Sequence, residues 1–310
     1  MFILKVQKMI ISNPIYKELT KLNLIKKKNL LILNNFTRDK KIKVLQDKIS
    51  KVIFLEKYTT DINYYSALKK DSIRRKNKIY DLTKLNNKNF IKSVKLDDEK
   101  RRFKEFKRLI MGKKILDFGC GFGGFLQLSL KVAKKTCGIE LRKDCVSFIK
   151  KNLKKINVQN NINNFDNNFD LITMFHVLEH IPFQIRTLKN LKKKIKKNGK
   201  ILIEVPSAQD FLLQFKNLKE FKNFTFWSEH LILHTEQSLR KILNKSGFKK
   251  IQIKYYQRYN LANHLGWFIN RQPGGHDFFN KIFDKKILNS YQNYLIRNKK
   301  TDTLIAIAQA

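Results

Sequence analysis

Glycines at alternate positions follow an apolar run that begins near residue 115. Residues 115–124 read ILDFGCGFGG, with Gly119, Gly121 and Gly123 in a turn between a predicted strand and a predicted helix. Glycine lets such a turn bring its backbone close to a ligand, and the helix N-terminus behind it favours anionic groups. Gly119, Gly121 and Gly124 also fit the dinucleotide spacing G-x-G-x-x-G. The turn therefore predicts a nucleotide-type ligand, with a purely structural turn as the alternative.

Two acidic residues accompany this turn. Asp117 comes two residues before the first glycine, where its carboxylate can order the loop and reach a ligand ammonium group. Glu140 ends the next apolar run, about 17 residues beyond Gly123, at the switch point where a ribose diol lies in such folds. The pair favours a nucleoside with an amino-acid tail. The alternative for Glu140 is a solvated glutamate at a strand end.

A third stretch, residues 168–182, runs from an apolar strand into a polar turn and a helix. It reads NFDLITMFHVLEHIP. Taken with the D-x-G-x-G-x-G loop and Glu140, it resembles the class I S-adenosylmethionine-dependent methyltransferases, in particular the branch that contains ubiquinone-pathway and sugar methyltransferases. The resemblance covers roughly residues 110–258, and the combination is more specific than any single motif.

The resemblance implies S-adenosylmethionine as the cofactor and a role for each matching position. Residues 119–121 are expected against the methionine part, Glu140 on the ribose, and residues 175–176 beside the sulfonium. Relatives often carry an acidic residue before the fourth strand, where this chain offers Asn161 as the adenine contact. The complete predicted cofactor set is Asp117, Gly119, Cys120, Gly121, Gly123, Glu140, Leu141, Asn161, Phe175 and His176.

Three histidines are candidates for catalysis. Methyl transfer needs a nucleophile in line with the sulfur–methyl bond, and this positioning is worth about 7–11 kcal/mol. For a hydroxyl acceptor, a general base adds about 10²- to 10⁴-fold in rate. His176, at the end of a predicted strand, is the first candidate base, with packing beside the cofactor as its alternative. His180 follows on the next turn, where capping or packing is the alternative.

The third catalytic candidate, His230, lies in a later segment. Residues 227–235 read WSEHLILHT and resemble the substrate-side stretch of the same family. Nearby Phe224, Phe226 and Trp227 are expected either to wall a sugar or ring, or to pack the segment onto the sheet.

Apolar runs alternate with amphipathic stretches from residue 97 onward, as in parallel βαβ units. Strands are predicted at residues 115–118, 136–140, 169–175, 200–205, 250–256 and 303–308. Helices are predicted at residues 97–110, 123–133, 143–153 and 183–196, and after an N-cap at Thr235. The predicted fold is α/β and Rossmann-like: a mostly parallel seven-stranded sheet flanked by helices, with a small N-terminal extension.

The predicted domains are an N-terminal extension and a catalytic domain. Residues 1–95 are expected to hold a short β hairpin, from apolar residues at 42–45 and 52–55, and a polar linker. Residues 96–310 form the predicted methyltransferase domain. Its two long segments, 206–234 and 259–300, are expected to be insertions that act as lids or substrate walls.

The charge balance is strongly basic, with 66 Lys and Arg against 25 Asp and Glu and a net charge of +41. Such a charge is typical of nucleic-acid binding, but Lys, Asn, Ile and Phe are abundant along the whole chain, which favours compositional drift. No run approaches the roughly 18 apolar residues of a membrane span, and residues 1–12 lack a signal cleavage site, so the location is predicted to be cytoplasmic. The three cysteines form no C-x-x-C pair and no histidine stands at zinc spacing, so no metal is expected.

The favoured function is methyl transfer to a small molecule, with a sugar or nucleotide-sugar of polysaccharide biosynthesis as the acceptor. A phosphate-bearing acceptor fits the basic surface. An RNA methyltransferase is the alternative that the charge suggests, although nucleic acid is not the favoured partner. The glycine spacing alone permits an NAD-dependent oxidoreductase, and a cofactor-binding protein without catalysis is a third alternative.

Overall fold

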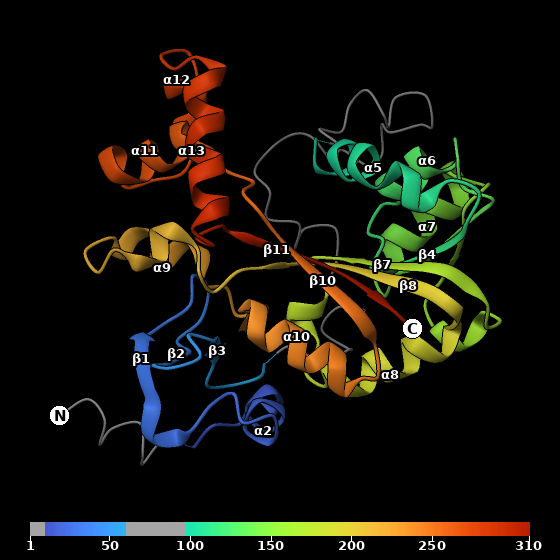
Figure 1. The fold of residues 1–310 in the computed structure, drawn as a ribbon, viewed down its shortest axis with the longest axis horizontal. Coiled ribbons are helices and arrows are strands. Elements are labelled where there is room, and N and C mark those ends of the chain that lie inside the picture. Colours follow the sequence, from blue (N-terminus) through green and yellow to red (C-terminus); the bar gives the residue numbers. More distant parts are fainter. Residues whose placement is uncertain (1–9, 60–96) are drawn as a thin grey trace. The chain divides into compact units, whose positions relative to one another are not determined.

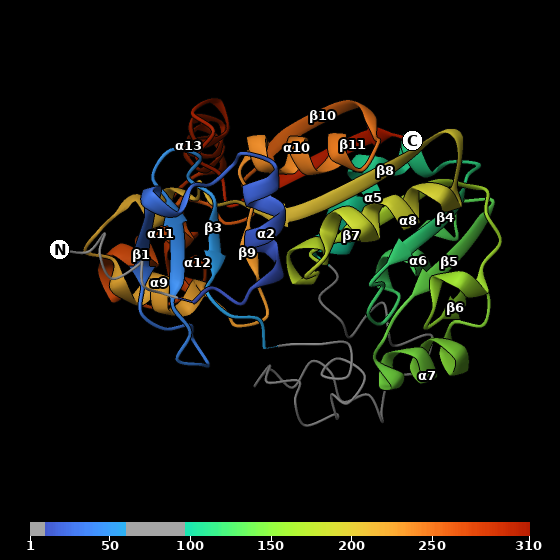
Figure 2. The ribbon, with the colours of Figure 1, turned by 90° about the horizontal axis from the view of Figure 1, so that it is seen from below.

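A seven-stranded sheet carries the predicted motifs in a computed structural model that describes residues 10–59 and 97–310. Its strands are β4 (Lys114–Phe118), β5 (Lys135–Ile139), β6 (Asn157–Gln159), β7 (Phe169–Phe175), β8 (Ile195–Pro206), β10 (Lys249–Tyr256) and β11 (Thr303–Gln309). Their order across the sheet is β10-β11-β8-β7-β4-β5-β6 (Figures 1 and 2). β4 pairs in parallel with both β5 and β7, and β5 pairs in parallel with β6. This mixed, mostly parallel sheet is the Rossmann-like fold predicted.

The helices that connect these strands follow the predicted amphipathic pattern. They are α5 (Asp97–Ile110), α6 (Gly124–Ser129), α7 (Lys143–Asn152), α8 (Gln184–Lys194) and α10 (Glu236–Lys245). α5 begins with three acidic residues, which favour the positive end of its dipole, and it buries Phe106 and Ile110. α10 begins at a capping box in which Thr235 and Ser238 exchange hydrogen bonds.

Several element ends differ from the prediction. The helix predicted to reach residue 196 ends at Lys194, and Asn198 and Gly199 lie inside β8. Asn198 there has a φ of +66°, a conformation that asparagine tolerates better than most residues. The edge strand β6 was missed because, of its three residues, only Val158 is buried.

The described chain divides into two compact units. Unit 1 comprises the described residues of Met1–Thr59, Leu178–Leu188 and Ile203–Ile307, and unit 2 comprises those of Thr60–Val177, Lys189–Leu202 and Ala308–Ala310. The division into an N-terminal extension, 1–95, and a methyltransferase domain, 96–310, stays a prediction. The polar linker predicted before residue 96 lies outside the described residues.

Unit 1 contains a second, four-stranded sheet. Its strands, in spatial order, are β1 (Leu30–Asn34), β2 (Val44–Asp47), β3 (Ile53–Leu55) and β9 (Ile232–Leu233) (Figure 2). β2 and β3 pair antiparallel, close to the two apolar runs at 42–45 and 52–55 from which a hairpin is predicted. The Asp47 carboxylate accepts hydrogen bonds from the backbone of the turn that joins the two strands. Helix α2 (Pro14–Lys21) contributes Ile15 and Leu19 to the apolar core of this unit.

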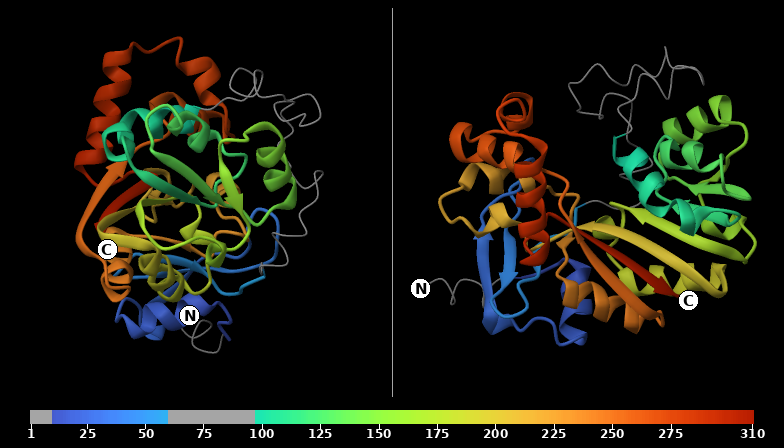
Figure 3. Two further views of the ribbon diagram at one scale, coloured as in Figure 1. Left: turned by 90° about the vertical axis from the view of Figure 1, so that its right-hand side faces the viewer. Right: turned by 45° about the horizontal axis from the view of Figure 1, so that its top comes forward.

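The segments predicted as insertions have secondary structure of their own. Residues 206–234 contain α9 (Lys219–Thr225) and end in β9. Residues 259–300 fold into α11 (Leu261–Asn270), α12 (Gly275–Phe279) and α13 (Lys285–Arg297), drawn in orange and red in Figure 3. Trp267 of α11 packs against Phe221 and Phe224 of α9, so the two segments share the core of unit 1.

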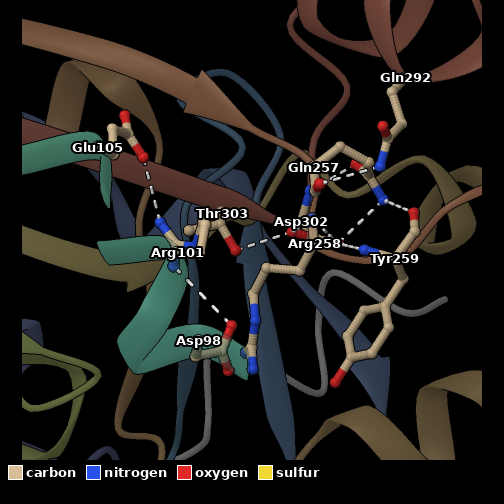
Figure 4. A network of polar contacts seen from close by, with 9 residues as sticks. All are labelled: Asp98, Arg101, Glu105, Gln257, Arg258, Tyr259, Gln292, Asp302 and Thr303. Atoms are coloured by element: carbon tan, nitrogen blue, oxygen red, sulfur yellow. Dashed lines mark hydrogen bonds and ion pairs between the residues drawn. The ribbon is translucent and has the colours of Figure 1, made fainter. Parts of the chain in front are cut away.

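A partly buried carboxylate, that of Asp302, holds the base of the second of these segments. Asp302 accepts hydrogen bonds from the Gln257 amide at 2.9 Å and from the backbone N–H groups of Arg258 and Tyr259 at 3.1 Å (Figure 4). Burial raises the pKa of Asp302, and these hydrogen bonds oppose that rise. The network joins the end of β10 to the start of β11, which gives it a structural role.

Candidate cofactor and acceptor sites

The glycine loop of unit 2 has the backbone shape that its sequence predicts. Gly119, Gly121 and Gly123 have φ values of +81°, +53° and +78°, a region that other residues rarely adopt. The N–H groups of Gly119 and Cys120 both donate to the Ile139 carbonyl, which holds the loop against β5. A Cβ atom added at Gly121 would meet nothing within 4 Å, whereas one at Gly119 would collide with the Val177 side chain. Gly121 therefore presents bare backbone to open space.

Glu140 turns its carboxylate towards this loop. Its Oε2 accepts a hydrogen bond of 2.8 Å from the Gly121 N–H, and its Oε1 accepts one of 2.9 Å from the Arg142 N–H. Each carboxylate oxygen keeps a second lone pair for a ligand hydroxyl. The carboxylate and the glycine backbone thus lie side by side, as a nucleoside site at the end of β5 requires.

Asp117 is a buried carboxyl group at the base of the same loop. Only 4% of its surface is exposed, and its Oδ1 accepts a hydrogen bond of 2.6 Å from the Thr173 hydroxyl. Burial raises its pKa to about 7, against the opposing effects of the Thr173 hydrogen bond and the Arg102 charge. At neutral pH this carboxyl is close to half ionised, so a nearby ligand cation would favour its ionised form.

The end of β7 supplies the next predicted cofactor residues. Phe175 packs edge-on against Phe125, with ring centroids 4.8 Å apart, and the Arg102 guanidinium lies 4.6 Å from its ring centre. His176 follows with a φ of +54°, a strained value for a non-glycine residue. Such strain is common where a side chain is held for function.

The remaining predicted cofactor positions include Asn161 and Leu141. Asn161 is exposed, and its side-chain oxygen caps the short helix η4 (Ile162–Asn164) by accepting from the Asn163 N–H at 2.9 Å. Leu141 is half-buried directly after Glu140. The adenine contact predicted for Asn161 stays a prediction.

The other two catalytic candidates lie in unit 1. His180 ends the short helix η5 (Leu178–His180), and His230 stands in the 227–234 segment. Their ring centroids are 4.9 Å apart, and the Leu231 N–H donates to the Glu179 carbonyl at 2.9 Å. Unit 1 therefore brings His180 and His230 together, whereas His176 belongs to unit 2.

An arginine that the sequence reasoning did not single out lies near these histidines in unit 1. The Arg38 guanidinium lies 5.0 Å from the ring centres of both Phe224 and Trp227, a pair of cation–π contacts. Trp227 in turn contacts His230, with ring centroids 5.7 Å apart. No local sequence pattern predicts these cation–π contacts, because Arg38 lies almost 190 residues from the rings it contacts.

Comparison with known proteins decides the family. A family model described as "Methyltransferase domain" matches residues 91–253, more than half of the chain. The chain belongs to this methyltransferase family. The assignment confirms the resemblance to class I S-adenosylmethionine-dependent methyltransferases that the loop, Glu140 and the 168–182 stretch carry.

The methyltransferase is similar to several curated proteins over part of its length. It is 28% identical to an uncharacterized protein of Methanocaldococcus jannaschii over 121 residues, 36% of this chain and 48% of that protein. It is 27% identical to the ubiquinone biosynthesis O-methyltransferase of Actinobacillus pleuropneumoniae over 29% of this chain and 44% of that enzyme. The chain thus spans about half the length of the curated relatives it matches.

Among solved structures, the methyltransferase resembles a SAM-dependent methyltransferase from Archaeoglobus fulgidus. That comparison has a TM-score of 0.47 and 18% identity, and it covers 70% of this chain and 95% of the other. Within the described residues, no helix has the length and apolarity needed to cross a membrane. S-adenosylmethionine is the cofactor that the family assignment supports, as the sequence predicted.

Proposed function

We propose that the protein transfers a methyl group from S-adenosylmethionine to a small-molecule acceptor. The observation that carries this proposal is the Glu140 carboxylate bonded to the Gly121 N–H, beside backbone that no side chain covers. Carboxylate lone pairs suit ribose hydroxyls, bare backbone suits the methionine part, and the Asp117 carboxyl suits its ammonium group. Holding the sulfonium methyl in line with a nucleophile then supplies most of the rate enhancement.

The acceptor that we propose is a sugar or nucleotide-sugar of polysaccharide biosynthesis, methylated in the cytoplasm. Trp227 and the half-buried His180 and His230 offer the aromatic face and polar groups that a sugar needs. The exposed Arg38 guanidinium suits a phosphate on such an acceptor. A general base at His176, His180 or His230 would take the acceptor proton.

Calorimetric titration with S-adenosylhomocysteine and with NAD tests the cofactor. We expect binding of S-adenosylhomocysteine alone, and its loss in Gly121→Val, because a branched side chain would occupy the ligand's space and strain a positive φ. Gly112→Val is the matched control, since Gly112 also has a positive φ and open space around its Cα but lies outside the loop. Tight NAD binding would overturn the proposal in favour of the oxidoreductase.

An RNA acceptor is the second candidate function, because of the net charge of +41. Filter binding of RNA at low and high salt distinguishes the two acceptors, since phosphate contacts weaken steeply with salt. An absence of RNA binding at low salt removes this candidate. Salt-sensitive binding followed by methylation of the RNA would replace the small-molecule acceptor.

A further inference from the structure

We propose that Glu179, His180 and His230 together bind a zinc ion. Each residue offers one ligand atom, and the carboxylate oxygen and two imidazole nitrogens all lie within 4.8 Å of one another. All three residues belong to unit 1, and none serves in the predicted cofactor site of unit 2. Two histidines and one carboxylate are the donor set of many zinc sites that keep a fourth position open.

Backbone hydrogen bonds already hold the two segments that supply these ligands. The Leu231 N–H donates to the Glu179 carbonyl at 2.9 Å, and the His230 N–H donates to the Trp227 carbonyl at 3.0 Å. The Trp227 and His230 rings form an edge-to-face contact, with ring centroids 5.7 Å apart. The ligands therefore stand on a backbone that needs no rearrangement to present them, which is the condition for a preorganised metal site.

The spacing of the ligand atoms is close to what zinc requires. Zinc bonds of about 2.0–2.2 Å in a tetrahedron place neighbouring ligand atoms about 3.4 Å apart. The upper limit of 4.8 Å here leaves a closure of about 1.4 Å or less, which rotations about the side-chain bonds of His180 and His230 can supply. Both histidines are only half-buried, so their rings have room to turn.

Burial explains why a cation would be bound firmly at this place. Glu179 is wholly buried, and a carboxylate withdrawn from water is stabilised strongly by a positive ion beside it. The imidazole nitrogens of His180 and His230 are ligands that suit zinc alongside a carboxylate. A zinc ion held by three protein ligands keeps one position open for a ligand oxygen. With His180 and His230 bound to zinc, His176 remains the candidate base.

This site differs from the sequence expectation that no metal is bound. That expectation rested on cysteine pairs and on histidines at short zinc spacing. Here two ligands are adjacent in sequence and the third follows about 50 residues later, so only the folded chain brings them together.

Zinc titration of the untagged, chelator-stripped full chain tests the proposal. We expect one zinc ion per chain, with affinity reduced about tenfold or more in both His180→Ala and His230→Ala. His276→Ala is the control, because His276 is exposed and lies outside the cluster, so its affinity should equal that of the unaltered chain. Equal losses in all three variants, or no zinc binding by the unaltered chain, would overturn the proposal.

Thermal melting separates loss of the ligand from loss of the fold. Zinc should raise the melting temperature of the unaltered chain and of His276→Ala, and at the same zinc concentration should raise that of the conservative variant His230→Gln less, because ligands stabilise the state that binds them. Cobalt bound in place of zinc should give the visible spectrum of a tetrahedral site. An octahedral cobalt spectrum, or binding of magnesium in preference to zinc, would contradict the assignment.

Discussion

The glycine loop and the histidine cluster are two polar regions built in opposite ways. The loop, Asp117 and Glu140 come from about 25 consecutive residues, and the contacts among them are set by one strand-turn-helix-strand unit. The cluster of Glu179, His180 and His230 joins segments about 50 residues apart through backbone bonds. A site of the first kind can be predicted from a linear motif, whereas a site of the second kind becomes visible only in the folded chain.

Removing the charge of Glu140 should have the largest effect on the loop site. Glu140→Gln weakens the acceptor of the Gly121 and Arg142 N–H groups and of the expected ribose hydroxyls, so S-adenosylhomocysteine affinity should fall about 10- to 100-fold. Calorimetry measures this loss. Zinc affinity should stay unchanged, and Glu105→Gln, on the surface of α5, should alter neither ligand. Unchanged S-adenosylhomocysteine affinity in Glu140→Gln would contradict the assignment of the cofactor site to the glycine loop and Glu140.

The pH dependence of cofactor binding should report the ionisation of Asp117. Its pKa is raised to about 7, so the ionised form that attracts an ammonium group is lost as pH falls through 7. S-adenosylhomocysteine affinity should therefore decrease towards acid, approaching about tenfold per pH unit well below 7. Titrations between about pH 5 and pH 8 measure this slope. Asp117→Asn should flatten the profile, and a profile that keeps its slope in this variant would assign the titration to another group.

A substitution at Asp39, far from both sites in sequence, tests whether the histidine cluster depends on distant parts of the chain. The Asp39 carboxylate accepts hydrogen bonds from the Ser228 N–H at 3.0 Å and from the Ser228 hydroxyl at 2.6 Å. Ser228 lies two residues before His230. Asp39→Ala should thus loosen the 227–234 segment and lower zinc affinity about threefold to tenfold, with cofactor affinity unaltered. Asp284→Ala removes a comparable cap at the start of α13 and serves as the control. Equal zinc affinities in the two variants would count against an assembled site.

The smallest effect is expected on stability alone. Thr235→Ala removes the hydroxyl that accepts the Ser238 N–H in the capping box of α10, which should cost about 1 kcal/mol. The melting temperature should fall by roughly 2–4 °C. A change in either ligand affinity would show that the cap also holds the neighbouring 227–234 segment in place.

The sequence predicts the central part of the fold because each element there carries a local signal. The strand from 169 to 175 was predicted at its observed bounds, and the helix from 97 to 110 likewise, since an unbroken apolar run and an acidic first turn mark them. β1, which reads LLILN, carries a similar apolar run and was missed, whereas β9 carries a weak signal. β9 has two residues, and its pairing with β3 joins Ile232 to Phe54 across almost 180 residues. Such long-range pairing leaves no trace in local periodicity.

The candidate sites divide in the same way. The three glycines, Asp117 and Glu140 could be chosen from spacing and strand position, and the structure places them together. Arg38 could not be chosen, because it is one of 66 basic residues and only its distant aromatic neighbours distinguish it. Asn161 was chosen by family analogy; its side-chain oxygen caps a turn, and its contact with adenine stays a prediction.

The Glu18 carboxylate of α2 accepts hydrogen bonds from the Gln184 and Ile185 N–H groups, the first turn of α8, at 3.1 and 3.2 Å. During synthesis, more than 160 further residues must therefore be added before Glu18 can cap α8 and before β3 can pair with β9. At about 5–20 residues per second, that interval lasts roughly ten seconds or longer. A shortened gene beginning at residue 96 would produce a chain whose α8 lacks its acidic cap and whose β9 lacks its neighbour.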